Sequence, residues 1–124
     1  MTTRLLVIDD EVHVLRSLAR ALRYRGAEVL TASDAKEALE LLEEHEVHAV
    51  VTDHHLPPGP TGIWLLENVM HRFPSVGRIL FSGKVVPHAD ELVRLGLVHQ
   101  FLRKPVTANE VLEATRTTRA SIRA

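Results

Sequence analysis

The chain has 124 residues, of which 45% are hydrophobic and none is cysteine. This length suits one domain with a sizeable core, and the lack of thiols excludes a disulfide framework and a thiolate zinc site. Fifteen basic and sixteen acidic residues give a net charge of -1, which argues against nucleic acid or an anionic membrane as the main partner. No apolar run approaches the roughly 20 residues of a membrane span, and the N-terminus lacks the order of a signal peptide. We therefore expect a cytoplasmic protein.

Five short apolar runs rich in β-branched residues are predicted to be strands. They are residues 4–8 (RLLVI), 28–32 (EVLTA), 49–52 (AVVT), 78–81 (RILF) and 100–103 (QFLR). The runs show little alternation of apolar and polar residues, which is typical of strands that are buried on both faces of a parallel sheet.

A helical pattern follows each predicted strand. The residues at or just before the five helix starts are, in chain order, Val12, Ser33, Gly62, Pro87 and Thr107. The first helix should end at Gly26, because glycine is favoured just past a helix end. Thr107 and Glu110 have the spacing of a capping box. The alternation of strands and helices predicts a doubly wound α/β fold, with helices on both faces of a five-stranded parallel sheet.

Two of these helices have a predicted core face. On the third, at about 100° per residue, the apolar side is formed by Ile63, Leu66, Val69, Met70 and Phe73. On the fourth, the residues expected to face the core are Ala89, Leu92 and Val93. Trp64 falls nearly opposite the apolar side of the third helix. Either Trp64 is exposed and contacts a partner or second copy of the chain, or Pro58 or Pro60 covers the indole.

Chemically reactive side chains stand where four of the strands end. The first strand is followed by Asp9 and Asp10, the third by Asp53, the fourth by Ser82 and the fifth by Lys104. In doubly wound sheets, ligands bind beyond the carboxyl ends of the strands, and neighbouring strands are about 4.8 Å apart. Carboxylates this close repel one another unless a cation lies among them. Magnesium fits, because it takes one or two carboxylates and leaves places for water and phosphoryl oxygens.

Four motifs carry these residues in order: VIDDE, VVTDHHLP, LFSG and FLRKP. Through them the chain resembles the receiver domain of response regulators in bacterial two-component signalling. The resemblance runs from Arg4 to Ile122, and we expect residues 1–124 to form one receiver domain, either free-standing or the N-terminal part of a longer protein. It implies the flavodoxin-like strand order 2-1-3-4-5. It also implies a phosphoacceptor switch that assists its own phosphorylation and dephosphorylation, rather than an enzyme with a separate substrate.

The resemblance gives the acidic residues their roles. Asp53 matches the aspartate that takes a phosphoryl group from a sensor histidine kinase or a histidine phosphotransfer protein. Asp9 and Asp10 match the acidic pair that holds the Mg²⁺ cofactor together with Asp53, and the backbone carbonyl of His55 matches a further metal ligand. An anionic nucleophile attacking a phosphate anion needs positive charge nearby, which explains the metal ion.

Three further residues match the switching machinery of the family. Ser82 corresponds to the hydroxyl that engages the phosphoryl group, Lys104 to the lysine that pairs with it, and Phe101 to the aromatic residue that changes rotamer. The surface that changes would be the fourth helix, the fifth strand and the fifth helix. The other partners expected are an output domain or a second copy of the chain, without direct contact to nucleic acid or a membrane.

The first predicted helix has a basic stripe, formed by His13, Arg16, Arg20 and Arg23 at three- and four-residue spacing. Such stripes are most often solvated surface. In the family, however, this helix faces the kinase, and we hypothesise that Arg16 and Arg20 steer that encounter.

One loop departs from the family pattern. Four residues separate Pro57 from Gly62, where the family commonly has three. Two other functions remain as alternatives: a receiver-like binding module that is never phosphorylated, and a phosphohydrolase of the haloacid-dehalogenase type. The second expects Asp-x-Asp after the first strand, whereas here Asp9 is followed by Asp10 and Glu11.

Overall fold

The computed structural model describes residues 2–123, and within this range five strands form one parallel sheet. The strands are β1 (Arg4–Ile8), β2 (Glu28–Ala32), β3 (Ala49–Asp53), β4 (Gly77–Ser82) and β5 (Gln100–Arg103). Their order is β2-β1-β3-β4-β5, with every neighbouring pair parallel. The predicted doubly wound fold and its flavodoxin-like strand order are confirmed.

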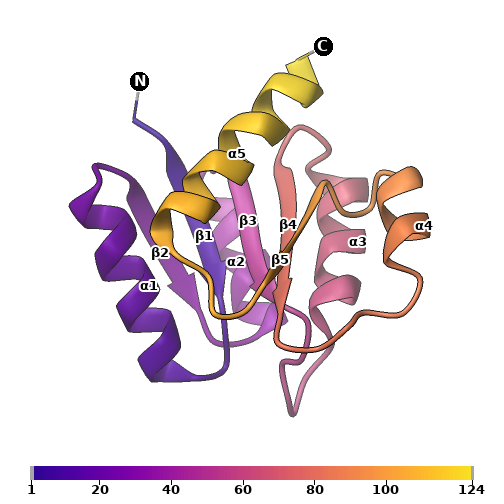
Figure 1. Ribbon diagram of the computed structural model, residues 1–124, viewed down its shortest axis with the longest axis horizontal. Helices are drawn as coiled ribbons and strands as arrows, with labels where there is room; N and C mark the ends of the chain where they lie inside the picture. Colours follow the sequence, from indigo (N-terminus) through magenta and orange to yellow (C-terminus); the bar gives the residue numbers. More distant parts are fainter. Residues whose placement is uncertain (1, 124) are drawn as a thin grey trace.

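Helices cover both faces of the sheet (Figure 1). They are α1 (Val12–Tyr24), α2 (Ala35–Glu44), α3 (Gly62–Arg72), α4 (Ala89–Arg94) and α5 (Ala108–Arg123). One apolar cluster joins the sheet to α1 and α5, and a second joins its other face to α2 and α3. Within residues 2–123, no helix has the length and apolar character needed to cross a membrane.

Side chains of each strand alternate between the two clusters. On β3, Val51 belongs to the cluster beneath α1 and α5, whereas Val50 belongs to the cluster beneath α2 and α3. On β4, Ile79 and Phe81 face α1 and α5, whereas Leu80 faces the other way. Because the period of a strand is two residues, the side chain that follows Val51 on the same face is that of Asp53.

The helix ends follow local signals in the sequence. The Thr107 side chain accepts a hydrogen bond from the Glu110 amide (3.2 Å), and the Glu110 carboxylate accepts one from the Thr107 amide (3.0 Å), so the predicted capping box is confirmed. Asp34 caps α2 by accepting from the Glu37 amide (2.8 Å). Gly26 follows the end of α1 with φ 93°, a conformation that favours glycine.

The predicted core face of α3 is partly correct. Leu66 and Val69 are fully buried, while the other three predicted residues, Ile63, Met70 and Phe73, are only partly buried. Leu65, which the helical pattern did not include, is fully buried because α3 packs against both α2 and the sheet. Trp64 is 39% exposed, so its indole is accessible at the surface.

The prediction that Val93 faces the core is wrong, since this side chain is 45% exposed. The helix α4 has six residues, none of them buried. Leu92 packs against the core, and Leu97 and Val98 complete that contact after the helix has ended. Leu92 and Val93 point about 100° apart around the helix, and α4 packs with Leu92 toward the core, which leaves Val93 toward solvent.

Candidate functional site

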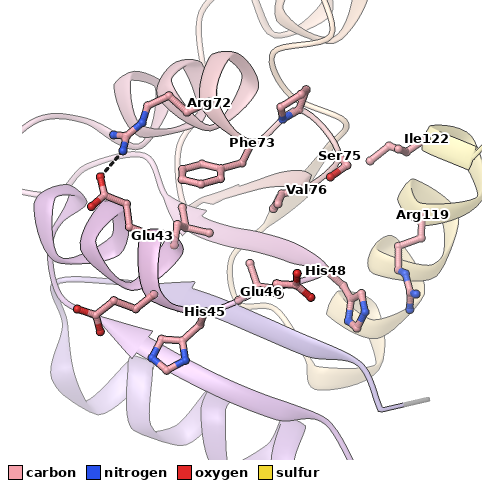
Figure 2. Close-up of a pocket in the computed structure, with 14 residues that line it drawn as sticks. Glu43, His45, Glu46, His48, Arg72, Phe73, Ser75, Val76, Arg119 and Ile122 are labelled. Atoms are coloured by element: carbon pink, nitrogen blue, oxygen red, sulfur yellow. Dashed lines mark hydrogen bonds and ion pairs between the residues drawn. The ribbon is translucent and has the colours of Figure 1, made fainter.

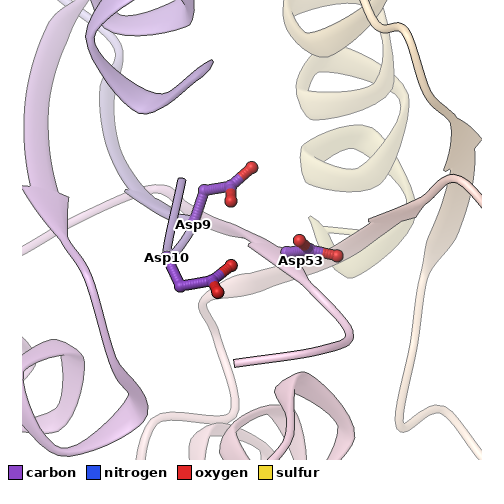
Figure 3. A group of neighbouring side chains, drawn as sticks. All are labelled: Asp9, Asp10 and Asp53. Carbon is purple, nitrogen blue, oxygen red and sulfur yellow. The ribbon is translucent and has the colours of Figure 1, made fainter. Parts of the chain in front are cut away.

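Three carboxylates gather at the carboxyl edge of the sheet. Asp9 and Asp10 follow β1, and Asp53 ends the neighbouring strand β3. One carboxylate oxygen from each residue lies within 4.8 Å of the other two. Figure 3 shows the three side chains grouped together. The sequence placed these residues together correctly, because parallel strands bring their carboxyl ends to the same edge.

Lys104 joins two of these acids. Its Nζ lies 2.9 Å from Asp53 Oδ2 and 3.1 Å from Asp9 Oδ2. Asp9 is 0% and Asp53 8% exposed, so both ion pairs are shielded from water. The Glu11 amide donates a further hydrogen bond to Asp9 Oδ1 (2.9 Å), which fixes the carboxylate at the start of α1.

Burial and charge act in opposite directions on these groups. Burial raises the pKa of Asp9, although the Glu11 amide and the Lys104 ammonium both act to lower it. Burial also acts to lower the pKa of Lys104, but the hydrogen bonds and charges of Asp53 and Asp9 outweigh it and leave this pKa raised. Lys104 therefore stays charged. With all three acids ionised, one ammonium leaves two carboxylates without a compensating positive charge.

The loop after β3 is held tightly at both ends. The Gly62 amide donates to the His54 carbonyl (2.8 Å), and a Cβ at Gly62 would lie 2.1 Å from the Asp53 carbonyl oxygen. Leu56 is buried, whereas Pro57 and the two residues that follow it are exposed. The tip of the lengthened loop therefore projects into solvent. Sequence reasoning used Gly62 as a helix start and as the end of the lengthened loop, and it missed this close approach to Asp53.

The two predicted switch residues lie on the strands beside the acidic cluster. Ser82 ends β4, and its Oγ accepts a hydrogen bond from the Lys84 amide (3.1 Å). Phe101 lies on β5 opposite Leu80 and is partly buried against the cluster beneath α2 and α3. The structure thus brings Asp9, Asp53 and Lys104 into direct contact, while Ser82 is hydrogen-bonded within its own turn.

The predicted partner residues lie outside this site. Arg16 and Arg20 are exposed on α1. Beside α1 runs a mainly apolar groove of about 740 Å³, whose lining includes Val14, Leu18 and Val106. Lys104 and Phe81 are also among the residues that line this groove. Trp64 lies in the first turn of α3, where its amide donates to the capping hydroxyl of Thr61 (3.1 Å).

A second cavity, of about 680 Å³, lies at the opposite edge of the sheet, among the ends of α2, α3 and α5 (Figure 2). Its wall includes Phe73, Val76 and Ile122, and an ion pair between Arg72 and Glu43 lies at its rim. None of the predicted site residues lines it.

The chain matches the family model of the response regulator receiver domain over residues 5–116. It belongs to this family. This membership makes the chain a receiver domain of two-component signalling and argues against the haloacid-dehalogenase alternative.

Relatives of this receiver domain include regulators of transcription. The chain is 31% identical over 116 residues to the hydrogenase transcriptional regulatory protein HoxA of Bradyrhizobium diazoefficiens, with 90% of this chain and 23% of that protein covered. It is 36% identical over 107 residues to the transcriptional regulatory protein CitT of Bacillus subtilis, with 84% of this chain and 46% of that protein covered. The chain therefore spans less than half the length of either relative.

Solved receiver structures have the same fold. The signal receiver domain of an HD domain-containing protein from Pseudomonas fluorescens Pf-5 superposes with a TM-score of 0.86 at 28% identity, covering 99% of this chain and 98% of that one. A response regulator from Burkholderia pseudomallei, solved with a phosphorylated aspartic acid, a calcium ion and citrate, gives 0.84 at 27% identity, covering 98% and 71%.

Proposed function

We propose that this receiver domain is a phosphoacceptor switch whose acceptor is Asp53. The observation that carries the proposal is the Lys104 ammonium, held between the carboxylates of Asp53 and Asp9 at 2.9 and 3.1 Å. A lysine in this position offers positive charge beside the Asp53 carboxylate and neutralises charge on an incoming phosphoryl group. A binding module that is never phosphorylated would have no use for a lysine held between these two carboxylates.

The reaction transfers one phosphoryl group to an oxygen of Asp53. The donor is a phosphohistidine of a sensor histidine kinase or of a histidine phosphotransfer protein. An O–P bond forms to Asp53 as the N–P bond of the donor breaks, and the electron pair of that bond stays with the imidazole, which takes up a proton. Hydrolysis of the acyl phosphate reverses the switch. In this proposal the domain assists both its phosphorylation and its dephosphorylation, and it has no separate substrate.

The donor set fits Mg²⁺. Carboxylate oxygens are the ligands that this hard cation prefers, and three of them lie within 4.8 Å of one another. Asp9, Asp10 and Asp53 would hold the ion together with the backbone carbonyl of His55. When bound, it supplies positive charge to the phosphoryl oxygens. The Burkholderia pseudomallei structure holds a calcium ion together with its phosphorylated aspartate, which is consistent with a divalent cation here.

The switch converts the added charge, about -1.5 to -2 for a phosphoryl group, into movement. To engage the phosphoryl group, Ser82 would release the Lys84 amide that its Oγ now accepts from. The movement of Ser82 would allow Phe101 to change rotamer. The surface that responds is formed by α4, β5 and α5, where Val93 of α4 and Leu95 just after it are exposed for an output domain or a second copy of the chain.

We further propose that the phosphoryl donor docks on α1. Arg16 and Arg20 are exposed there, and the apolar groove beside α1 leads to Lys104. Charged residues at the rim and apolar residues at the centre are typical of protein interfaces. In this scheme residues 1–124 work as one receiver unit in the cytoplasm, where the catalytic part of a sensor kinase acts.

Labelling with acetyl phosphate tests the acceptor. With Mg²⁺ present, intact-mass measurement should show one labile phosphoryl group on the wild-type protein and none on Asp53→Asn. The variant Asp10→Ala removes a metal ligand but keeps the nucleophile, so labelling should be slower and should need more Mg²⁺. Wild-type labelling of Asp53→Asn would refute the assignment, and a wild-type protein that resists every phosphodonor would favour the never-phosphorylated binding module.

A further inference from the structure

An aromatic ring lies directly beneath the predicted active-site lysine. Phe81 is 0% exposed and stands opposite Asp53 in the register of β3 and β4. It belongs to the cluster beneath α1 and α5, on the face of the sheet where Asp53 also points. The Nζ atom of Lys104 lies over this ring, 5.0 Å from its centroid.

The Lys104 ammonium therefore has three attractive neighbours. Two are the carboxylates of Asp53 and Asp9, and the third is the negatively polarised face of Phe81. A cation is attracted to an aromatic face within about 6 Å, and the attraction grows when both groups are shielded from water. The side chain of Lys104 is only 21% exposed, so this condition is met.

The three contacts respond differently to a divalent cation. The oxygens that hold Lys104 belong to two of the acids that would bind Mg²⁺. An ion bound there neutralises much of the charge that attracts the ammonium. The ring of Phe81 offers no oxygen to a hard, hydrated ion, so its attraction for Lys104 remains.

We propose that Phe81 is a positioning residue that keeps the Lys104 ammonium beside the phosphoacceptor when a divalent cation competes for Asp9 and Asp53. The inference rests on the proposed function of Asp53 and goes beyond it, because the resemblance to the family assigns no role to Phe81. A leucine could fill a similar apolar space at this position but would present no negative face.

Fluorinated phenylalanines separate this role from simple packing. Replacing Phe81 by its 4-fluoro, 3,5-difluoro and 3,4,5-trifluoro analogues withdraws charge from the ring face in steps while the ring shape is nearly kept. With acetyl phosphate and Mg²⁺, the rate of labelling at Asp53 should fall stepwise, by about 3- to 10-fold for the trifluoro analogue. Phe81→Leu should show at least the same fall, whatever its effect on the thermal midpoint.

A second measurement uses the unphosphorylated protein. Nuclear magnetic resonance relaxation of the Lys104 side chain reports how tightly the ammonium end is held, with and without Mg²⁺. In the wild-type protein the side chain should stay ordered when Mg²⁺ is added. In the trifluoro protein it should become mobile under the same conditions, because the ring no longer compensates for the neutralised carboxylates.

The chain offers a matched control at Phe73. The guanidinium of Arg72 lies over that ring, 5.3 Å from its centroid, at the edge of the sheet opposite the acidic cluster (Figure 2). The same fluorinated series at Phe73 should leave the labelling rate unchanged. If the labelling rate and the Lys104 mobility are both constant across the Phe81 series while Asp53 labels normally, the role of Phe81 is overturned and the proposed function stands. If the wild-type protein does not label at Asp53, the proposed function fails, and the relaxation measurement still decides whether Phe81 holds Lys104.

Discussion

His99 should make this protein sensitive to mild acid. This residue lies just before β5. Its Nδ1 accepts a hydrogen bond from the Arg78 amide (3.0 Å), and its Nε2 lies 3.3 Å from the Arg78 guanidinium. Arg78 is itself only 5% exposed, and its guanidinium donates to the carbonyls of Pro74, Val76 and Gly96. A proton added to His99 would therefore create a second buried cation next to the first.

The size of the effect follows from the pKa of His99. Burial, and then the charge of Arg78, lower this pKa from 6.5 to about 4. Between these two values the unfolded chain binds a proton that the folded protein does not. The contribution of neutral His99 to the free energy of unfolding is thus fully present above pH 6.5. As the pH drops below this value, the free energy of unfolding falls by up to about 1.4 kcal/mol per pH unit. Between pH 7 and pH 4.5 this amounts to about 2 kcal/mol for this one residue.

The variant His99→Asn isolates this contribution. The asparagine side chain can still accept from the Arg78 amide but does not titrate. Urea denaturation at pH 7, 6, 5 and 4.5, in the presence of a chelator, should show that the wild-type protein loses about 2 kcal/mol more stability over this range than the variant. Asp9, whose pKa is raised by burial, acts in the opposite direction, but it is present in both proteins and cancels in the difference.

Two results would contradict this reasoning. Parallel stability curves for the two proteins would mean that protonation of His99 costs nothing in the folded state. A direct titration of the His99 ring by nuclear magnetic resonance that gave a midpoint near its ordinary value would mean that the ring reaches water in solution.

Three further predictions concern the surroundings of the acidic site. Gly62→Ala should cost at least about 1–3 kcal/mol of stability and slow labelling, because its Cβ would lie 2.1 Å from a backbone oxygen of β3. As a control, Gly59→Ala should leave stability and labelling nearly unchanged, because its Cβ would lie 3.9 Å from the nearest atom. Reversing the charge of Arg16 and Arg20 should slow phosphotransfer from the cognate kinase but not from acetyl phosphate, and equal slowing of both would remove the docking role. The fluorescence of Trp64, which is 39% exposed, should be accessible to a soluble quencher in dilute protein and become protected on phosphorylation or self-association; a signal already protected in dilute monomer would favour cover by the loop prolines.

The order of strands and helices could be read from the sequence because it depends on local patterns. Apolar runs, helical spacing and capping residues gave every strand to within one residue at each end. The gathering of Asp9, Asp53 and Lys104 was equally predictable, since any parallel sheet brings the carboxyl ends of its strands to one edge. The roles assigned to these residues came from the family motifs and stay predictions until the labelling experiment is done.

Other features depend on register and packing between segments far apart in the chain. The place of Phe81 beneath Lys104 follows from its pairing with Asp53 across β3 and β4, and no local pattern encodes that register. The contact of Arg78 with His99 likewise depends on how β4 and β5 align. The exposure of Val93 depends on which side of the short helix α4 packs against the core. Periodicity along the chain identifies which residues share a face, but only the packed structure decides which atoms meet across it.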